Sequence, residues 1–426
     1  MEEKGYNADV LVIGAGIAGI EASLLLSRSG RKVYLVEKTS YIGGNVIKYE
    51  EVFSNMECAT CMVAPKQQEL LQDKNIELLT LSEVESVQGS FGNFVVKVKK
   101  RARYVDLQNC IGCSACYEPC PVSLKNEFEQ GLGERKAIYV PCPGTLPNVP
   151  AIDTENCLRF KKGEDCQLCK EACMFEAIDF TQKDEEIELK VGAIIVTTGF
   201  TTFDPTKIPQ YGYGKLSDVY TAFEFERMYA SNGPTGGNIV LKNGESPKSV
   251  AIIHCVGRKE KGYCSTVCCM YSLKFIHYLK HKLPDVKISE FYSDLCIPGK
   301  SYQRFYEKMK ETGVNLIRSD GIEVSEEGKG MVVKHKSGTG EENGLAVDMV
   351  ILAPAIEPRP DAPELSKVLD IPQDTDGFFT EEHSEFASVC TPKQGVFIAG
   401  CVQGPKDIQD SVAQSEAAVG KVLSTL

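Results

Sequence analysis

Cysteine is the residue type whose number and spacing in this chain could do chemistry. The chain of 426 residues has eighteen cysteines, five histidines and no tryptophan, and most of the cysteines fall into three groups. The amino terminus lacks the basic and apolar segments of a secretory signal, so a reducing cytoplasm is expected. There, clustered cysteines indicate metal or redox sites rather than disulfides, and a thiolate-rich ligand set favours iron–sulfur centres.

The largest group contains two runs, Cys-x2-Cys-x2-Cys-x3-Cys-Pro and Cys-x8-Cys-x2-Cys-x3-Cys. The first is the run of bacterial ferredoxins, in which the fourth cysteine of each run serves the other cluster. A zinc ribbon is the alternative, but zinc does not require two interlocked sets. The rule predicts two [4Fe-4S] sites, one held by Cys110, Cys113, Cys116 and Cys173, the other by Cys120, Cys157, Cys166 and Cys169. Cys142 fits neither run and is expected to be structural.

Another group follows the β-branched run 249–253, which reads as a buried strand. Its spacing, Cys-x8-Cys-x3-Cys-Cys, suits a third [4Fe-4S] cluster, because x3 puts two thiols on one side of a helical turn. The alternative is a set of buried, inert cysteines. The group stands where a two-domain flavin reductase has its glycine turn for NAD(P)H, so that site is expected to be lost. The predicted ligands are Cys255, Cys264, Cys268 and Cys269.

A dinucleotide-binding fingerprint, Gly-x-Gly-x-x-Gly, occupies residues 14–19 between a predicted strand (9–13) and helix (20–29). Its glycines allow a tight turn and close approach of the backbone to a pyrophosphate at the helix N-terminus. A second strand ends at an acidic residue placed to bind ribose hydroxyls, and the glycine pair beyond it is typical of FAD sites. The residues predicted to bind FAD in this part of the chain are Gly14, Gly16, Gly19, Glu37, Lys38, Gly43 and Gly44.

Later segments supply the remaining predicted FAD contacts. Residues 189–196 read as one buried strand that leads into the turn Thr197-Thr198-Gly199, whose last two residues are predicted FAD contacts. Residues 395–401 read as a strand that ends in Gly400-Cys401. In flavin reductases the latter strand ends in Gly-Asp, so Cys401 is a departure. The final helix, 410–423, begins at Asp410, where backbone N–H groups would face the flavin pyrimidine carbonyl.

Cys58 and Cys61 precede Pro65-Lys66. Disulfide-reducing flavoenzymes carry a cysteine pair at about this place, followed by Pro and Lys. The pair is therefore either a flavin-facing dithiol or ligand pair, or two packed cysteines near a helix end, and the sequence leaves both open.

Together these features predict an α/β protein, a two-lobe Rossmann flavoprotein with an inserted di-cluster ferredoxin module. The strand 348–354 is expected to cross back to the FAD domain. The predicted domains are FAD-binding parts at 1–103, 183–245 (with a linker at 231–246) and 346–426, the ferredoxin insertion at 104–182, and a second Rossmann-like lobe with the third cluster at 246–345.

Charge and hydropathy exclude several classes of function. The formal net charge is −12 and the isoelectric point is about 5.2, which argues against a nucleic-acid or anionic-membrane surface. No apolar run approaches the roughly 18 residues of a membrane helix, so a soluble cytoplasmic protein is expected.

The chain resembles the A subunit of heterodisulfide reductase almost end to end. The residues that carry the resemblance are Gly14 to Gly19, Cys58-Ala59-Thr60-Cys61, Pro65-Lys66, the ferredoxin insertion, Gly133 to Tyr139, Tyr263 to Tyr271 and Gly404 to Ile408. The resemblance implies a thioredoxin-reductase-like body that binds FAD and three [4Fe-4S] clusters. It further implies that Lys274 lies close to the flavin N5, whereas the residues alone suggest a solvated helix lysine.

The function implied is that of an oxidoreductase subunit in which FAD splits electron pairs between a high-potential and a low-potential acceptor. The alternative is a one-electron relay in a quinone-linked, sulfur-metabolising or aromatic-ring-reducing complex. The implied partners are proteins similar to the B and C subunits of heterodisulfide reductase, and ferredoxin or hydrogenase- or dehydrogenase-type donors. A homodimer within a larger complex is implied as well. A direct NAD(P)H reductase and a cofactor-free scaffold are disfavoured.

Overall fold

The structure, a computed structural model, describes residues 5–319, 321–328, 330–336 and 340–426. The chain forms two compact units. Unit 1 comprises the chain up to Ile47 together with Cys61–Phe200 and Pro358–Leu426. Unit 2 comprises Lys48–Thr60 and Thr201–Glu357.

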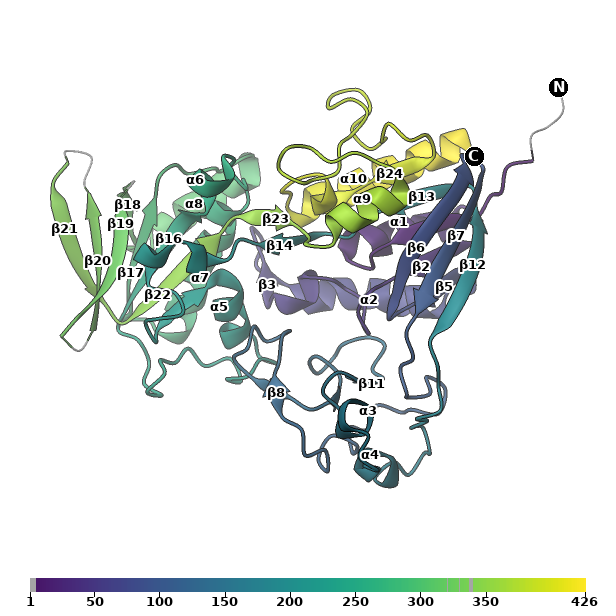
Figure 1. Cartoon of the computed structure of the whole chain (residues 1–426). Coiled ribbons are helices and arrows are strands. Elements are labelled where there is room, and N and C mark those ends of the chain that lie inside the picture. The colour runs from purple at the N-terminus through teal and green to yellow at the C-terminus, as the bar shows by residue number, and fades with distance from the viewer. Residues whose placement is uncertain (1–4, 320, 329, 337–339) are drawn as a thin grey trace. The chain divides into compact units, whose positions relative to one another are not determined.

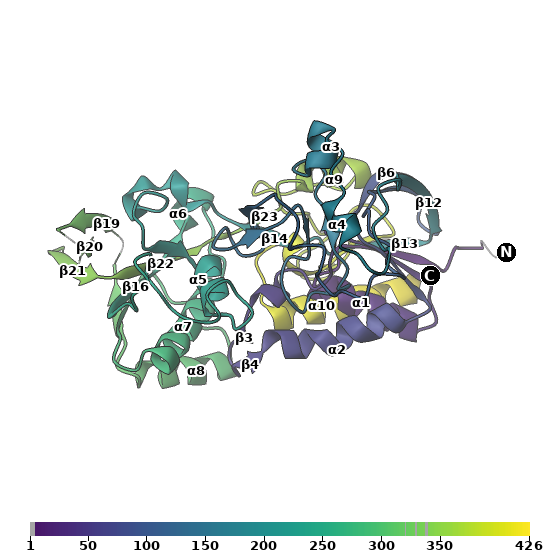
Figure 2. The same ribbon diagram turned by 90° about the horizontal axis from the view of Figure 1, so that it is seen from below.

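Unit 1 is built on a parallel sheet in the order β24-β13-β1-β2-β5. Its strands are short runs of buried aliphatic residues, as expected where both faces of a sheet are covered. Helices α1 and α10 lie side by side along it (Figures 1 and 2), and Ser415 Oγ of α10 donates to Ala18 O of α1 at 2.6 Å. The bounds are β1 (Val10–Ile13), β2 (Val33–Val36), β5 (Ile76–Leu79), β13 (Ala193–Val196), β24 (Val396–Ile398), α1 (Ile17–Arg28), α2 (Ala59–Gln72), α9 (Ala362–Leu369) and α10 (Ile408–Thr425).

An antiparallel sheet, β12-β7-β6, packs on the same core. The cysteine-rich segment 101–184 leaves from the end of β7 and returns at the start of β12, where Lys100 pairs with Glu185. Figure 1 shows this insertion as loops with short elements. The bounds are β6 (Ser82–Ser90), β7 (Asn93–Lys100), β12 (Glu185–Val191), β8 (Leu124–Lys125), β9 (Glu134–Arg135), β10 (Ile138–Tyr139), β11 (Ala151–Ile152), α3 (Leu158–Lys162) and α4 (Leu168–Glu171).

Unit 2 has its own parallel sheet, in the order β15-β22-β16-β17-β18, and an antiparallel sheet β19-β20-β21. Its core is formed by aliphatic residues of both sheets. The bounds are β3 (Glu51–Val52), β4 (Glu57–Cys58), β14 (Phe200–Thr202), β15 (Val219–Thr221), β16 (Ser249–Val256), β17 (Lys287–Tyr292), β18 (Asn315–Arg318), β19 (Ile322–Glu327), β20 (Gly330–Lys336), β21 (Glu342–Val347), β22 (Met349–Pro354), β23 (Ile356–Pro358), α5 (Ala222–Tyr229), α6 (Arg258–Lys261), α7 (Cys268–Lys282) and α8 (Lys300–Lys310). Short 3-10 turns are η1 (Val46–Lys48), η2 (Pro205–Lys207), η3 (Pro209–Tyr211) and η4 (Gly400–Val402).

Two strand predictions are wrong. The run 189–196 contains the end of β12 and the whole of β13, which belong to different sheets. The chain passes from one to the other at Gly192, where the backbone comes so close to Asn7 that a Cβ would lie 1.9 Å from Asn7 O. The strand at 348–354 does not cross back to the FAD domain. As β22 it pairs in parallel with β15 and β16.

The unit boundaries differ from the predicted ones accordingly. The chain enters unit 2 after Phe200 and returns at Pro358, so the linker expected at 231–246 lies inside unit 2. Residues 48–60 also belong to unit 2, within the range expected for the first FAD-binding part. No helix among the described residues is long and apolar enough to cross a membrane.

Candidate functional site

The turn between β1 and α1, with the first residues of the helix, has no room for a Cβ at Gly14 or Gly19. Gly14 has a φ of +103°, and a Cβ there would lie 2.6 Å from Thr197 O. At Gly19 a Cβ would lie 1.8 Å from Gly14 O. Gly16, the N-cap of α1, has no side chain to bond the first N–H groups of the helix. The positive end of α1 is thus not used by a capping side chain, which suits a phosphate group.

The second glycine pair packs directly on this turn. Gly43 N donates to Ala15 O at 2.7 Å, and a Cβ at Gly44 would lie 2.8 Å from Gly16 Cα. Two backbone segments free of side chains therefore meet at the carboxyl end of β1, where α/β sheets bind nucleotides. This cradle fits the pyrophosphate of FAD.

Glu37 and Lys38 have different surroundings. The Glu37 carboxylate accepts from Ala15 N and Thr39 N, each at 2.8 Å, and so lies at the cradle. Lys38 Nζ instead lies 3.0 Å from an Asp361 carboxylate oxygen and 3.2 Å from one of Glu83. Glu37 is placed for the predicted ribose contact, whereas the role of Lys38 in cofactor binding stays a prediction.

Some partners of the other predicted FAD contacts were missed by sequence reasoning, but Thr197 was not. Thr197, the first residue of the predicted turn, donates to Gly14 O at 2.7 Å and joins β13 to the cradle. Gly400 N donates to Gln414 Oε1 at 2.7 Å. Buried Cys401 donates to Lys406 O at 3.3 Å, and Asp410 N to the N-cap Asp407 at 2.8 Å. An Asp directly before a helix is a typical N-cap, and this signal could have found Asp407 from the sequence.

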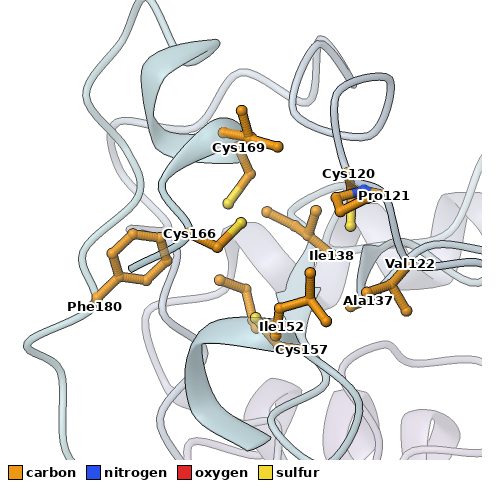
Figure 3. A pocket seen from close by; sticks show the side chains of 12 residues that line it. Cys120, Pro121, Val122, Ala137, Ile138, Ile152, Cys157, Cys166, Cys169 and Phe180 are labelled. Atoms are coloured by element: carbon orange, nitrogen blue, oxygen red, sulfur yellow. The ribbon is translucent and has the colours of Figure 1, made fainter. Parts of the chain in front are cut away.

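The insertion brings one predicted cysteine quartet to a single hollow (Figure 3). The hollow measures about 370 Å³, including space open to solvent. Figure 3 shows the sulfurs of Cys166 and Cys169 directed into it. Its lining includes all four cysteines of one predicted cluster, Cys120, Cys157, Cys166 and Cys169.

Cysteines of the other predicted quartet influence one another's pKa. Burial raises the pKa of Cys110, and the nearby sulfurs of Cys173 and Cys113 raise it further. Burial raises the pKa of Cys116 to about 12, with added repulsion from Cys169, Cys110 and Cys173. The sulfurs that act on Cys116 thus belong to both predicted quartets.

The chemistry of the donor set at the hollow fits an iron–sulfur cluster. The hollow offers four cysteine thiols, and thiolates are the ligands that a [4Fe-4S] cluster takes. The described part of the chain has no group of three or more His, Cys, Asp or Glu that could hold a metal ion. The assignment of clusters therefore stays a prediction.

The third cysteine group lies in unit 2 at the start of α7. Cys255 is in β16, Cys264 is in the following loop, and Cys268-Cys269 begin α7. The pKa of buried Cys268 lies well above its ordinary value because of its hydrogen bond to Cys269, its burial, and repulsion from the other three sulfurs. All four predicted ligands are therefore neighbours. The loop is fixed by Tyr263 OH, which donates to Ile356 O at 2.6 Å, and by Ser265 Oγ, which accepts from Ile356 N at 2.8 Å.

A buried acid–base pair adjoins this group and was not found from the sequence. His254 Nε2 lies 3.5 Å from a Glu290 carboxylate oxygen, and both side chains are fully buried. Neither ring nitrogen of His254 has a hydrogen-bond partner among the described residues. The hydrogen bond from Cys268, together with His254, lowers the pKa of Cys269 far below its ordinary value. Cys269 is therefore a ready thiolate, which is the form that binds metal.

Lys274 is buried, so the alternative prediction of a solvated lysine on a helix surface is wrong. Its Nζ lies 2.7 Å from a Glu226 carboxylate oxygen and donates to Glu51 O at 2.8 Å. Rings of Tyr271 and Tyr278 lie 4.5 and 5.0 Å away. Burial lowers the pKa of Lys274, and Glu226 opposes the change. Its role at the flavin stays a prediction.

Cys58 and Cys61 fall in different units. Cys58 ends β4 in unit 2, and Cys61 lies in the first turn of α2 in unit 1. Whether they form a flavin-facing dithiol therefore stays open.

Comparison with known proteins agrees with this site. Residues 9–121 match the FAD dependent oxidoreductase family. The chain is 40% identical over 96% of its length to the A subunit of the H(2):CoB-CoM heterodisulfide,ferredoxin reductase of Methanothermobacter marburgensis. It is 41% identical over 98% of its length to the A subunit of the Ferredoxin/F(420)H(2)-dependent CoB-CoM heterodisulfide reductase of Methanosarcina acetivorans. The chain is similar to the A subunits of CoB-CoM heterodisulfide reductases. It spans 63% and 53% of those two relatives.

The fold agrees with a solved structure. Thioredoxin reductase of T. acidophilum superposes with a TM-score of 0.53 at 14% identity, covering 98% of both chains. This confirms the predicted thioredoxin-reductase-like α/β fold. The family match and the glycine cradle support FAD as cofactor, and the similarity to heterodisulfide reductases supports an oxidoreductase.

Replacing Gly19 by alanine should remove most of the FAD from the purified protein, because the new Cβ would collide with the Gly14 carbonyl. Flavin absorbance per chain measures this. The matched control is Gly420→Ala in α10, where a Cβ meets nothing within 4 Å and alanine favours the helix by roughly 0.5–1 kcal/mol. Equal FAD contents in the two variants would contradict the cradle.

Replacing Cys120 by alanine should lower the iron content by about four per chain, because a cubane would lose one of its four thiolates. Iron analysis of anaerobically purified protein measures the loss. Cys142→Ala, at a buried cysteine outside both runs, should leave the iron content unchanged. If both variants lose iron equally, the loss reflects general instability of the insertion rather than a missing ligand.

Replacing Lys274 by methionine should lower the free energy of unfolding by about 3–5 kcal/mol, because Glu226 is left as an unpaired buried charge. Denaturant unfolding followed by fluorescence measures it. The control Lys308→Met, at an exposed position of α8, should change it by less than about 0.5 kcal/mol. An equally small effect at Lys274 would show that the Lys274–Glu226 pair is not formed.

Proposed function

We propose that this chain is the FAD and iron–sulfur subunit of a heterodisulfide-reductase-type complex, and that it divides electron pairs from FAD between two acceptors. The observation that carries the proposal is the eight-cysteine insertion, whose quartets lie in the same compact unit as the glycine cradle. FAD supplies the chemistry that thiolate clusters lack, since it takes up electrons in pairs and releases them singly.

Three separate cysteine quartets support more than one exit for electrons. Two lie in the insertion of unit 1, and the third lies at α7 of unit 2, where an NAD(P)H reductase would have a glycine turn. We assign all three to [4Fe-4S] clusters. Lys274 contributes a positive charge held in a dry interior by Glu226, and charge near the flavin is one of the protein's levers on its potential.

The surface of the insertion supports a protein as electron partner. Ile111, between Cys110 and Cys113, is 62% exposed, and Met174, directly after Cys173, is 86% exposed. Leu107 and Phe175 are exposed nearby in the chain. Contiguous exposed apolar patches mark protein-interaction sites, and we propose that these four side chains belong to one beside the predicted clusters. The partners we propose are proteins similar to the B and C subunits of heterodisulfide reductase, together with ferredoxin- or hydrogenase-type donors. We further propose that this chain forms a homodimer within that complex and that the complex is cytoplasmic.

A stepwise anaerobic reductive titration of the purified chain tests the division of electron pairs. We expect little or no flavin radical in the EPR spectrum at any potential, because a flavin that divides pairs must release its second electron at much lower potential than its first. Absorbance spectra should pass directly from oxidised to fully reduced flavin. A flavin radical that persists over a wide range of potential would instead favour a one-electron relay.

A further inference from the structure

The third cysteine site contains one more thiol than its sequence spacing indicates. Cys296 lies in the loop after β17, 27 residues beyond Cys269. Together with Leu295 it packs against the buried side chains of Cys268 and Cys269. The site is therefore formed by five cysteines rather than four.

Contacts of Cys296 are to the predicted ligands themselves. Its backbone N–H donates to Cys269 Sγ at 3.3 Å, and the same sulfur lies 3.7 Å from Asp294 O. The Cys296 sulfur has Cys264 and Cys269 as its charged neighbours, with Arg258 opposite in sign. Cys296 thus faces the same space as the loop and helix cysteines.

Cys255 is connected to the loop of Cys296 through Arg258. Its φ is +59°, and its sulfur accepts from Arg258 Nη1 at 3.9 Å. The same Arg258 nitrogen lies 3.2 Å from an Asp294 carboxylate oxygen, two residues before Cys296. Arg258 therefore joins the strand that carries Cys255 to the loop that carries Cys296.

A buried pair next to Cys255 joins the two strands of the site. His254, adjacent to Cys255 in β16, is 2% exposed, and its Nε2 lies 3.5 Å from a carboxylate oxygen of Glu290 in β17. The loop that carries Cys296 follows β17. The pair therefore ties the strand of Cys255 to the strand that leads to Cys296.

We propose that Cys296 is an alternative fourth ligand of the third cluster. A cubane takes four thiolates, so Cys264, Cys268 and Cys269 bind three irons while Cys255 and Cys296 compete for the fourth. In the exchange the iron–sulfur bond to Cys255 breaks and one to Cys296 forms. The proton released by Cys296 passes to Cys255, so the charge of the site is unchanged. This inference rests on the third cluster of the proposed function.

The experiment compares alanine variants of the full-length chain, reconstituted anaerobically with iron and sulfide. Alanine is chosen because, unlike serine, it cannot ligate iron. The variants are Cys255→Ala, Cys296→Ala, the double variant and the control Cys390→Ala, a buried cysteine of unit 1. FAD and iron per chain are measured, together with the EPR spectrum after reduction.

We expect about twelve irons per chain for the wild type, both single variants and the control, and about eight for the double variant. The two single variants should also give different EPR spectra of the third cluster, because different thiolates complete it. A fall to about eight irons in Cys255→Ala, with the iron content and spectrum of Cys296→Ala unchanged, would overturn the proposal. So would twelve irons in the double variant.

The wild type separates this inference from the proposed function. About eight irons with a full complement of FAD in the wild type would mean that the third cluster itself is absent, which contradicts both. About twelve irons in the wild type, with the pattern that overturns the exchange, would leave the proposed cofactor content intact and remove only Cys296 from the ligand set.

Discussion

Gathering many thiols close to one another is the constraint on which the rest of this structure depends. Burial raises the pKa of Cys116 to about 12 and that of Cys169 to about 11, and the neighbouring sulfurs add to both increases. Without a cation among them these thiols would remain protonated and neutral. A bound metal reverses this preference and deprotonates a coordinating thiol. The described helices of the insertion, α3 and α4, have only five and four residues, and its cysteines pack with a small apolar cluster that includes Val105, Ile138 and Ile178.

The insertion is attached to the part of unit 1 that carries the glycine cradle. For the proposed clusters to exchange electrons with FAD, the contacts that attach it must be rigid. Arg103 supplies several of them, since its guanidinium donates to Val149 O at 2.7 Å and to Ser40 O and Thr80 Oγ1 at 2.8 Å. Ile42, next to the glycine pair, pairs with Leu146. The insertion is therefore fixed to the loop that precedes Gly43.

Local chemistry was readable from the sequence wherever a short segment completes it. The strand, glycine turn and helix at 10–28 are contiguous, and each cysteine run carries its spacing within itself. Features that depend on partners distant in the chain were not. Nothing local distinguishes β22 as a strand of unit 2, because its neighbours β15 and β16 are set by tertiary pairing. Cys296 has no cysteine near it in sequence, and the burial of Lys274 depends on Glu226, 48 residues away.

Unit 2 solves the problem of buried charge in a different way from the insertion. It buries Lys274 with Glu226 and His254 with Glu290, each side chain at most 1% exposed. Such pairs add little stability, because desolvation offsets most of the attraction and an apolar pair of similar volume often serves as well. Their presence is therefore poorly explained by folding alone. Both pairs involve α7 or its cysteines: Lys274 lies five residues after Cys269, and His254 lowers the pKa of Cys269. A positive charge placed beside a thiolate stabilises the ionised form, so His254 of β16 favours the thiolate of Cys269 at the start of α7.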